Sequence, residues 1–467
     1  MVRRFLLGAG VAVGVGLVAG VLAVGRPALA DEGRGALLAS RDASGEIRTL
    51  DVNGPLDLTN PFFQDLGTNG RTCFSCHRPE QGWTITPESV RRRFDETRGL
   101  DPIFRNNDGS NCAGADISTL SKRRTAFSLL MNRGLIRIAE DLPIGAEFVI
   151  DSIDDPYACN VPLTGVSVYR RPLPSTNLTF LTAVMWDGRE SSATTTLLQD
   201  LAQQADDATI KHAQASLHLT PAEQQAIVSF ETGLYTAQAR DDRAGSLHAD
   251  DAYGGPRYLS RQPFFIGIND PVGLNPSGTA FDPSAFTLFA SWSASHSGHD
   301  AAATARASIA RGEVLFNTKP IVITGVAGLN NFTFASGVTV PDPFTGNCTT
   351  CHDTPNVGDH SVKAPLNLGL TDASRRTPDQ PLYTLRRLST GETTTTTDPG
   401  RAIITGKWAD IGKFKGPILR GLTARAPYFH NGSAASIEDA IDFYDTRFNI
   451  GLTLQEKADL AAFLRAL

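Results

Sequence analysis

The chain has 467 residues and a formal net charge of −6, from 43 lysines and arginines against 49 aspartates and glutamates. This acidic balance argues against a nucleic-acid-binding protein, whose surface needs a basic patch. The length suffices for two or more domains, each with its own hydrophobic core.

Residues 1–30 are typical of a secretory signal peptide. Two arginines precede an apolar run over residues 5–25, and the small residues Ala28 and Ala30 follow it. We expect cleavage after Ala30 and export to the periplasm. An uncleaved anchor is the alternative, because a run of about 20 apolar residues can span a bilayer. Cleavage would remove three arginines and leave 40 basic residues against 49 acidic ones, a net charge of −9, with no second membrane-spanning run.

Two stretches, residues 73–77 and 348–352, spell C-x-x-C-H. This pattern is typical of covalent haem c attachment, in which two thiols form thioethers with the porphyrin and the following histidine ligates the iron. A zinc site or a thioredoxin-like pair explains the cysteines, but not a histidine directly after the second cysteine in both copies. We therefore predict two covalently bound haem c groups, held by Cys73, Cys76, His77, Cys348, Cys351 and His352.

Two further cysteines, Cys112 and Cys159, complete the six in the chain. An oxidising compartment permits a disulfide between them. Two free buried thiols are the alternative.

The chain also repeats a helical pattern. Residues 219–230 and 452–463 share L-T-x-x-E followed by an apolar stripe, which predicts a helix with a threonine N-cap and a glutamate that closes a capping box. A second echo links Trp186-Asp187-Gly188 with His430-Asn431-Gly432. Both echoes follow a C-x-x-C-H motif in the same order, so we predict two similar domains. Their expected bounds are 31–240 and 303–467, with a connecting insertion over 241–302.

The predicted fold class is mainly α with long loops. The strongest periodic segment, residues 303–316, is helical, whereas strand-like alternation is short and scattered, as at 147–150 and 321–324. Glycine and proline are frequent over 254–283 and 325–346, which predicts loop insertions. The threonine run over 393–397 is expected in a turn-rich connection.

Several motifs together resemble the bacterial di-haem cytochrome c peroxidase and MauG family over most of the mature chain. They are C-x-x-C-H at 73–77 and 348–352, M-W-D-G-R at 185–189, G-E-x-L-F at 312–316, D-x-G-R at 398–401, F-K-x-P-x-L-R at 414–420 and A-P-Y-F-H-N-G at 426–432. The resemblance implies two cytochrome c-like domains with one haem each. It also implies a peroxidatic N-terminal haem and an electron-transferring C-terminal haem.

The resemblance assigns roles by position. His77 and His352 would be the proximal ligands, and Trp186 would lie between the haems. The peroxidases have a methionine ligand fourteen residues after the histidine of A-P-Y-F-H. Here that count reaches Tyr444, as in MauG-like members, and the second half of the chain contains no methionine. A helix capped by Ser436 would place Tyr444 on an apolar face. Without the family count, Tyr444 reads as a core aromatic.

The distal side of the first haem is less defined. Peroxide chemistry needs an acid or base that moves a proton between the two oxygens. The family's glutamine and glutamate fall, by count, on Thr196 and Asp206. Gln199 and Asp200 are alternatives, the first by a small insertion and the second by the internal repeat. His212 is a further candidate. Each of these residues, taken alone, is more often a solvated helix residue.

The family's calcium site is doubtful in this chain. Arg425 stands where the peroxidases have a threonine, and Asn177 is the nearest asparagine ahead of Trp186. The backbone carbonyl of Pro427 could still coordinate a hard cation. An arginine in place of the cation is the other way to neutralise the interface.

The resemblance implies a periplasmic oxidoreductase that reduces hydrogen peroxide. Electrons would come from a small donor protein, a cytochrome c or a cupredoxin, or from an aromatic side chain of a partner protein, as in MauG. One alternative is a dioxygenase similar to the di-haem rubber oxygenases. Another is an electron-transfer cytochrome without enzymatic activity. A modest acidic charge is compatible with a basic electron carrier, but it mostly reflects solubility.

Overall fold

The computed structural model describes residues 35–192, 194–262, 287–294, 300–326, 328–333, 337, 339–352 and 365–467. The predicted signal peptide and much of the predicted connecting insertion lie outside these ranges. None of the described helices is long and apolar enough to cross a bilayer.

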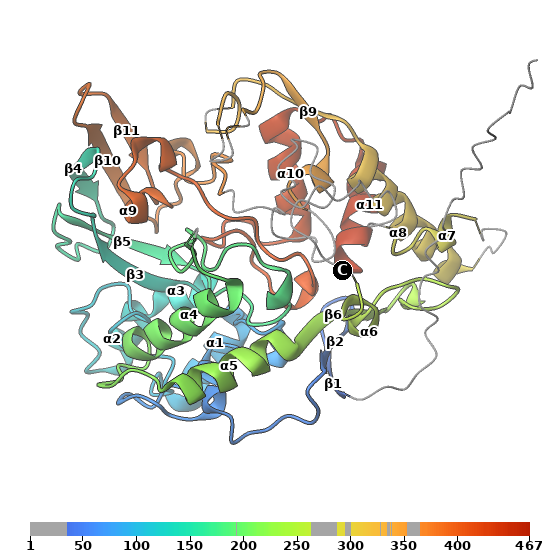
Figure 1. The fold of residues 1–467 in the computed structure, drawn as a ribbon, viewed down its shortest axis with the longest axis horizontal. Helices are drawn as coiled ribbons and strands as arrows, with labels where there is room; N and C mark the ends of the chain where they lie inside the picture. The colour runs from blue at the N-terminus through green and yellow to red at the C-terminus, as the bar shows by residue number, and fades with distance from the viewer. Residues whose placement is uncertain are drawn as a thin grey trace, which may run out of the picture. The chain divides into compact units, whose positions relative to one another are not determined.

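A four-stranded antiparallel sheet opens the described chain, in the order β1-β2-β6-β7 (Figure 1). Its strands are β1 Ala36–Arg41, β2 Gly45–Asp51, β6 Leu234–Asp241 and β7 Gly245–Ser246. The carbonyl of Leu467 accepts a hydrogen bond from the backbone N–H of Gln238 at 3.1 Å. The last residue of the second half therefore lies against a strand of the first half.

Five α-helices belong to the first half of the chain. They are α1 Pro87–Thr97, α2 Leu120–Ala126, α3 Ser128–Arg133, α4 Leu197–Lys211 and α5 Pro221–Gly233. The predicted start of α5 is confirmed, because Thr220 caps it and Glu223 closes the capping box. Helix α4 begins with a similar box, formed by Thr196 and Gln199.

Six more helices follow in the second half. They are α6 Pro256–Leu259, α7 Ser291–Ala294, α8 Ala301–Thr318, α9 Ala402–Thr405, α10 Ile437–Phe448 and α11 Leu454–Arg465. The predicted helical segment 303–316 lies within α8, and Thr453 and Glu456 form the predicted capping box of α11. Helices α8 and α11 touch at Gly312, where an added Cβ would sit 2.0 Å from the carbonyl oxygen of Asp459. The glycine of G-E-x-L-F thus permits this close helix contact.

The remaining strands form three small antiparallel sheets. They are β3 Ile136–Asp141 with β5 Gly165–Arg170, β8 Ile321–Ile323 with β9 Phe344–Gly346, and β4 Phe148–Asp154 with β10 Leu382–Arg387 and β11 Thr393–Thr396. Strand β4 of the first half pairs directly with β10 of the second (Figure 1). A shared core that includes Phe148, Ile150, Tyr383 and Leu385 lies beneath this pairing.

The prediction of a mainly α fold is therefore wrong for the described residues, which contain eleven strands as well as eleven α-helices. The two strand-like segments noted in the sequence are indeed strands, β4 and β8. The threonine run is strand β11 rather than a turn-rich connection, because β-branched residues suit a strand that can pair with a partner. That partner, β10, is set by the tertiary fold.

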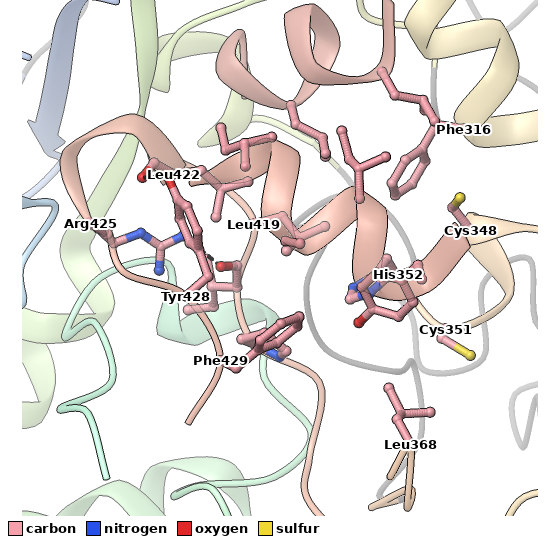
Figure 2. A pocket seen from close by; sticks show the side chains of 18 of the residues that line it. Phe316, Cys348, Cys351, His352, Leu368, Leu419, Leu422, Arg425, Tyr428 and Phe429 are labelled. Atoms are coloured by element: carbon pink, nitrogen blue, oxygen red, sulfur yellow. Dashed lines mark hydrogen bonds between the residues drawn. The ribbon is translucent and has the colours of Figure 1, made fainter. Parts of the chain in front are cut away.

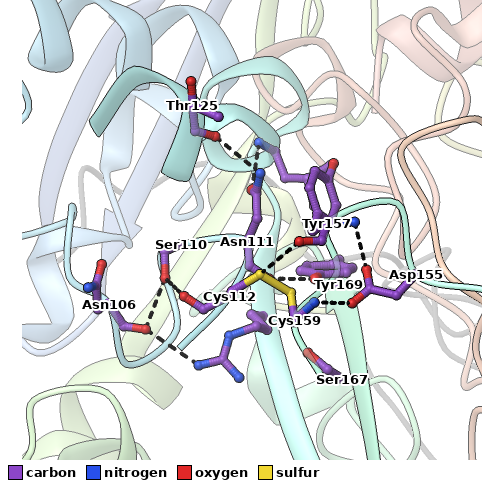
Figure 3. Close-up of a disulfide and its surroundings, with 12 residues drawn as sticks. Asn106, Ser110, Asn111, Cys112, Thr125, Asp155, Tyr157, Cys159, Ser167 and Tyr169 are labelled. Carbon is purple, nitrogen blue, oxygen red and sulfur yellow. Dashed lines mark hydrogen bonds between the residues drawn. A yellow bond between two sulfur atoms is a disulfide. The ribbon is translucent and has the colours of Figure 1, made fainter. Parts of the chain in front are cut away.

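Cys112 and Cys159 form a disulfide that joins two segments 47 residues apart (Figure 3). Around it, the hydroxyl of Tyr169 donates to the carbonyl of Asn111 at 2.6 Å, and the hydroxyl of Ser110 donates to the carbonyl of Cys112 at 2.6 Å. Of the two alternatives that the sequence left open, the structure has the bonded one.

Candidate functional site

The two C-x-x-C-H motifs adopt the same local structure. Each cysteine pair starts in a short 3-10 turn, Cys73–Ser75 or Cys348–Thr350. In each motif the backbone N–H of the histidine donates to the carbonyl of the first cysteine at 3.0 Å. One turn therefore presents two sulfur atoms and an imidazole together, as covalent haem attachment requires.

The first motif lines a cavity of about 1390 Å³, part of it open to solvent. His77 is buried here, and its Nδ1–H donates to the carbonyl of Trp83 at 2.9 Å. Because a carbonyl can only accept, the Nε2 lone pair is left for a metal. Burial lowers the pKa of His77 to about 4, so the imidazole is neutral at physiological pH. Burial also raises the pKa of Cys73 to about 12. This donor set fits a haem c with a histidine ligand.

The second motif lines a cavity of about 1430 Å³, again partly open to solvent (Figure 2). The ring centroids of His352 and Tyr444 are 6.3 Å apart and their planes are nearly perpendicular, at 86°. The predicted face of α10, with Ile437, Ala440, Ile441 and Tyr444, borders this space. Burial raises the pKa of the Tyr444 phenol. An imidazole and a phenol thus lie within one cavity, and both can ligate iron.

Trp186 lines both cavities, as do Arg171 and Ile418. Its indole Nε1–H donates to the carbonyl of Arg171 at 2.8 Å. The indole is almost fully buried. The tryptophan that the sequence analysis assigned to the space between two haems therefore borders both candidate haem cavities.

A buried ion-pair network holds the turn that carries Trp186. Arg170 donates to Asp187 at 2.5 Å and to Asp398 at 2.7 and 2.8 Å, and Arg189 donates to Asp187 at 2.7 Å. Burial alone would raise the pKa of Asp187, but Arg170 and Arg189 outweigh it and hold that pKa well below its usual range. Arg401 donates to the carbonyl of Asp187 at 2.9 Å. The W-D-G-R and D-x-G-R motifs, far apart in sequence, therefore form one structure.

The second internal echo is also visible in the backbone. Met185 and Phe429, which precede the two echo triplets, have φ angles of 67° and 66°. The glycines that end the triplets, Gly188 and Gly432, have φ angles of 68° and 63°. These left-handed values recur at matched positions, so the two turns share a conformation that favours glycine at its end.

Of the distal candidates named from the sequence, Gln199, Asp200 and Asp206 do not line the first cavity, whereas His212 does. The side chain of Gln199 accepts from the backbone N–H of Thr196 at 2.9 Å in the capping box. Asp200 accepts from the hydroxyl of Thr195. Asp206 accepts from the backbone N–H of Leu219 and from His218 Nδ1, both at 2.7 Å. Gln199 and Asp200 therefore bond at the start of α4, and Asp206 bonds to the segment just before α5.

A different face of α4 borders the first cavity. Its residues are Leu201, Gln204, Ala205, Ala208 and Thr209, followed by His212 just after the helix. The sequence analysis missed Gln204, although helical spacing from Leu201 and Ala205 could have placed it on this face. His212 Nδ1 lies 2.5 Å from the Asp108 carboxylate, which also pairs with the buried Arg71. Burial opposes ionisation of Asp108, but Arg71 and His212 keep its pKa lowered.

The sequence analysis also missed Glu231 on α5, which borders the same cavity. It is buried, and its Oε2 has no hydrogen-bond partner among the described atoms. Burial raises its pKa to about 8. The carboxyl group is therefore mostly protonated at neutral pH. No local sequence signal distinguishes it from a solvated helix glutamate.

The residues discussed for a calcium site have other contacts. Asn177 pairs with the backbone of Thr236: its Oδ1 accepts from the N–H and its Nδ2 donates to the carbonyl, both at 2.8 Å. The Arg425 guanidinium donates to the carbonyls of Gly421, Ile418 and Arg420. Among the residues that the structure describes, no three His, Cys, Asp or Glu side chains group together as a metal site.

Comparisons with known proteins show what the chain is similar to. The cytochrome-c peroxidase IdrP1 of Pseudomonas sp. (strain SCT) is 32% identical over 140 residues, and IdrP2 of Denitromonas iodatirespirans is 33% identical over 135. The chain is a relative of the bacterial cytochrome c peroxidases. This relationship agrees with the family resemblance found in the sequence. The match covers 26% of this chain and 36% of each of these peroxidases, so the chain spans about a third of their length.

Two further likenesses accompany these. The cytochrome c551 peroxidase of Nitrosomonas europaea is 38% identical over 69 residues, which cover 15% of this chain and 21% of that protein. A crystal structure of a MauG-like protein associated with microbial copper homeostasis aligns over 89% of this chain and 90% of its own, with 17% identity and a TM-score of 0.39. No protein-family model matches the chain.

Proposed function

We propose that this chain is a periplasmic di-haem c oxidoreductase that reacts with hydrogen peroxide at the haem held by His77. Electrons would pass through Trp186 and the haem held by His352 and Tyr444. The observation that carries the proposal is the position of Trp186, which borders both cavities. The protein would have two cytochrome c-like domains, 31–240 and 303–467, joined by the insertion 241–302, and a cleaved signal peptide over 1–30.

When bound, each haem supplies an iron that changes oxidation state and, where a coordination position is open, reacts with peroxide. His77 would offer Nε2 to one iron, with its Nδ1–H fixed by the Trp83 carbonyl. His352 and Tyr444 would hold the other iron. A phenolate ligand donates charge and stabilises higher iron oxidation states. This pairing favours MauG-like oxidation of a partner's aromatic side chain over a simple peroxidase with a methionine ligand.

His212 is the best-placed residue to move protons in the first cavity. Asp108 holds its Nδ1, so Nε2 can take a proton from peroxide and return it to the leaving oxygen. Gln204 can contribute a second hydrogen bond from the same side. Asp206, Gln199 and Asp200 would serve only if α4 rearranged.

Trp186 can pass an electron without losing its proton. Its Nε1–H is bonded to the carbonyl of Arg171, which accepts a hydrogen bond but cannot act as a base at neutral pH. Electron transfer through the indole would therefore leave the proton in place. The electron donor would be a small basic carrier, a cytochrome c or a cupredoxin, or a protein substrate.

Mössbauer spectroscopy of the diferric holoprotein, before and after one equivalent of hydrogen peroxide, tests the proposal. A change in the signals of both irons supports shared oxidising equivalents and a MauG-like role. A change only after prior reduction of one haem supports a peroxidase that needs reductive activation. In Trp186→Phe we expect only one iron to respond promptly.

No reaction with peroxide in either oxidation state would contradict the proposal. Oxygen consumption with an alkene substrate would then favour the dioxygenase alternative. If no added ligand bound either iron, a plain electron-transfer cytochrome would be favoured.

A further inference from the structure

Two buried arginines near Trp186 have no acidic partner. Arg171 is 5% exposed and Arg425 is 7% exposed. Their guanidinium groups donate only to backbone carbonyls, those of Arg133, Ile85 and Arg425 for Arg171, and those of Gly421, Ile418 and Arg420 for Arg425. Within the described part of the chain, neither guanidinium lies within ion-pair distance of a carboxylate.

The neighbouring Arg170, by contrast, is paired with carboxylates. It is 2% exposed and bonds to both Asp187 and Asp398, which raise its pKa above the usual value. By contrast, burial and the nearby Arg425 lower the pKa of Arg171 to about 9, and burial lowers that of Arg425 to about 10. Buried charges are normally paired, because taking an ion out of water is costly.

The positions of these two arginines indicate where the missing negative charge lies. Both line the second cavity, and Arg171 also lines the first. Arg425 borders the cavity that contains His352 (Figure 2). Its three hydrogen bonds to backbone carbonyls use Nε and Nη2. Most of the other residues around that cavity are leucine, isoleucine, proline and aromatic side chains, which offer no counter-charge.

We infer that Arg171 and Arg425 bind the propionate carboxylates of the haem groups that fill the two cavities. The inference rests on the haem-binding part of the proposed function, and not on its peroxide chemistry. A guanidinium is a planar fork that matches a carboxylate and can bond it with two N–H groups. Arg425 would hold a propionate of the haem attached at Cys348 and Cys351. Arg171, bordering both cavities, would place its charge beside both haems and Trp186.

This arrangement has a consequence for the redox potentials. A fixed positive charge beside a propionate stabilises the reduced, more negative form of a haem. Removing the charge should lower the midpoint potential of the haem that it contacts. Because two side chains of the protein supply this charge, chelators should leave the potentials unchanged.

The test uses full-length holoprotein and three variants, Arg425→Gln, Arg425→Lys and the control Arg137→Gln. Arg137 is 8% exposed and, like Arg425, donates to backbone carbonyls without a carboxylate partner in the described residues. It lines neither cavity. The control therefore reports the effect of removing a buried arginine that lies away from the haems. Pyridine haemochrome assays first establish that each protein carries two haems.

Potentiometry and resonance Raman spectroscopy then give the readouts. In Arg425→Gln we expect a lower midpoint potential for one haem and a shifted propionate bending band. Arg425→Lys should have a midpoint potential closer to that of the wild type, because lysine keeps the positive charge. Arg137→Gln should change neither readout. An unchanged band and potential in Arg425→Gln, or equal shifts in Arg137→Gln, would overturn the inference. If Arg425→Gln does not fold, Arg171→Gln replaces it. Absence of haem would instead contradict the proposed function itself.

Discussion

The rings of Trp186 and His430 meet edge to face, with centroids 6.2 Å apart and planes at 68°. These residues occupy equivalent positions in the two echo triplets. The other face of His430 stacks on Phe414 at 4.1 Å and 18°. Burial lowers the pKa of His430 to about 4, so the ring is neutral. The two similar turns thus bring one aromatic ring from each half into contact, and one of these rings, that of Trp186, lines both cavities.

His430 is completely buried, yet neither ring nitrogen has a hydrogen-bond partner among the described atoms. His430→Phe should keep the packing between Phe414 and Trp186 and remove two unsatisfied nitrogens. We expect the free energy of unfolding to stay the same or rise by about 1–3 kcal/mol. His430→Ala should lower it by about 2–5 kcal/mol, because it leaves a cavity. Urea unfolding measures both. Equal destabilisation by the two variants would indicate a hydrogen-bonding role for the imidazole.

Tyr444→Phe tests the second iron ligand. The phenol oxygen is lost, while the ring keeps its contacts with Phe443 and Phe448. We expect a changed visible and EPR spectrum for one haem only, with the unfolding free energy altered by less than about 1.5 kcal/mol. An unchanged spectrum would show that Tyr444 is a core aromatic and not a ligand.

His212→Ala should slow the reaction with peroxide by about 10²–10⁴-fold, the usual loss for a proton-transfer residue. Stopped-flow mixing with peroxide measures the rate. Asp206→Asn is the matched comparison, because Asp206 binds Leu219 and His218 and does not line the cavity. That variant should lose stability and retain its rate. A slower reaction with peroxide in Asp206→Asn, together with an unchanged rate in His212→Ala, would instead assign the proton transfer to Asp206.

Glu231→Gln tests the buried carboxyl group. Burial raises its folded-state pKa from the ordinary value of 4.5 to about 8. Between these two values the folded protein keeps a proton that the unfolded chain releases, so rising pH destabilises the fold by up to about 1.4 kcal/mol per pH unit. The glutamine variant should lack this contribution. The difference between the melting temperatures at pH 5 and pH 8 should therefore be smaller in the variant than in the wild type. Equal differences in the two proteins would show that Glu231 is ionised in the folded protein.

Asp187→Asn tests the network that holds Trp186. The change removes one charge that bonds both Arg170 and Arg189 in a fully buried setting. We expect the unfolding free energy to fall by about 3–5 kcal/mol. Asp242→Asn is the control, since the Asp242 pair with Arg41 is exposed, and it should not change stability measurably. Similar losses in both variants would argue against a special role for burial.

Local sequence was sufficient to predict the features that depend on neighbouring residues. The C-x-x-C-H spacing identified two segments that adopt the same local structure, and the threonine and glutamate pairs predicted the starts of α5 and α11. A capping box or a haem-attachment turn involves only a few consecutive residues, so short-range sequence carries the information. Tyr444, in α10, was reached only through the family resemblance, by counting fourteen residues from His430, which lies before that helix.

Long-range contacts had to come from the tertiary structure. Strand β11 exists because β10 pairs with it, and β10 in turn pairs with β4 from the other half of the chain. The face of α4 that borders the first cavity depends on how the helix packs, and this packing favours His212 over Asp206 among the candidates named from the sequence. The partner of His212, Asp108, lies 104 residues away. Pairings at such separations depend on packing of the whole chain, and no local pattern records them.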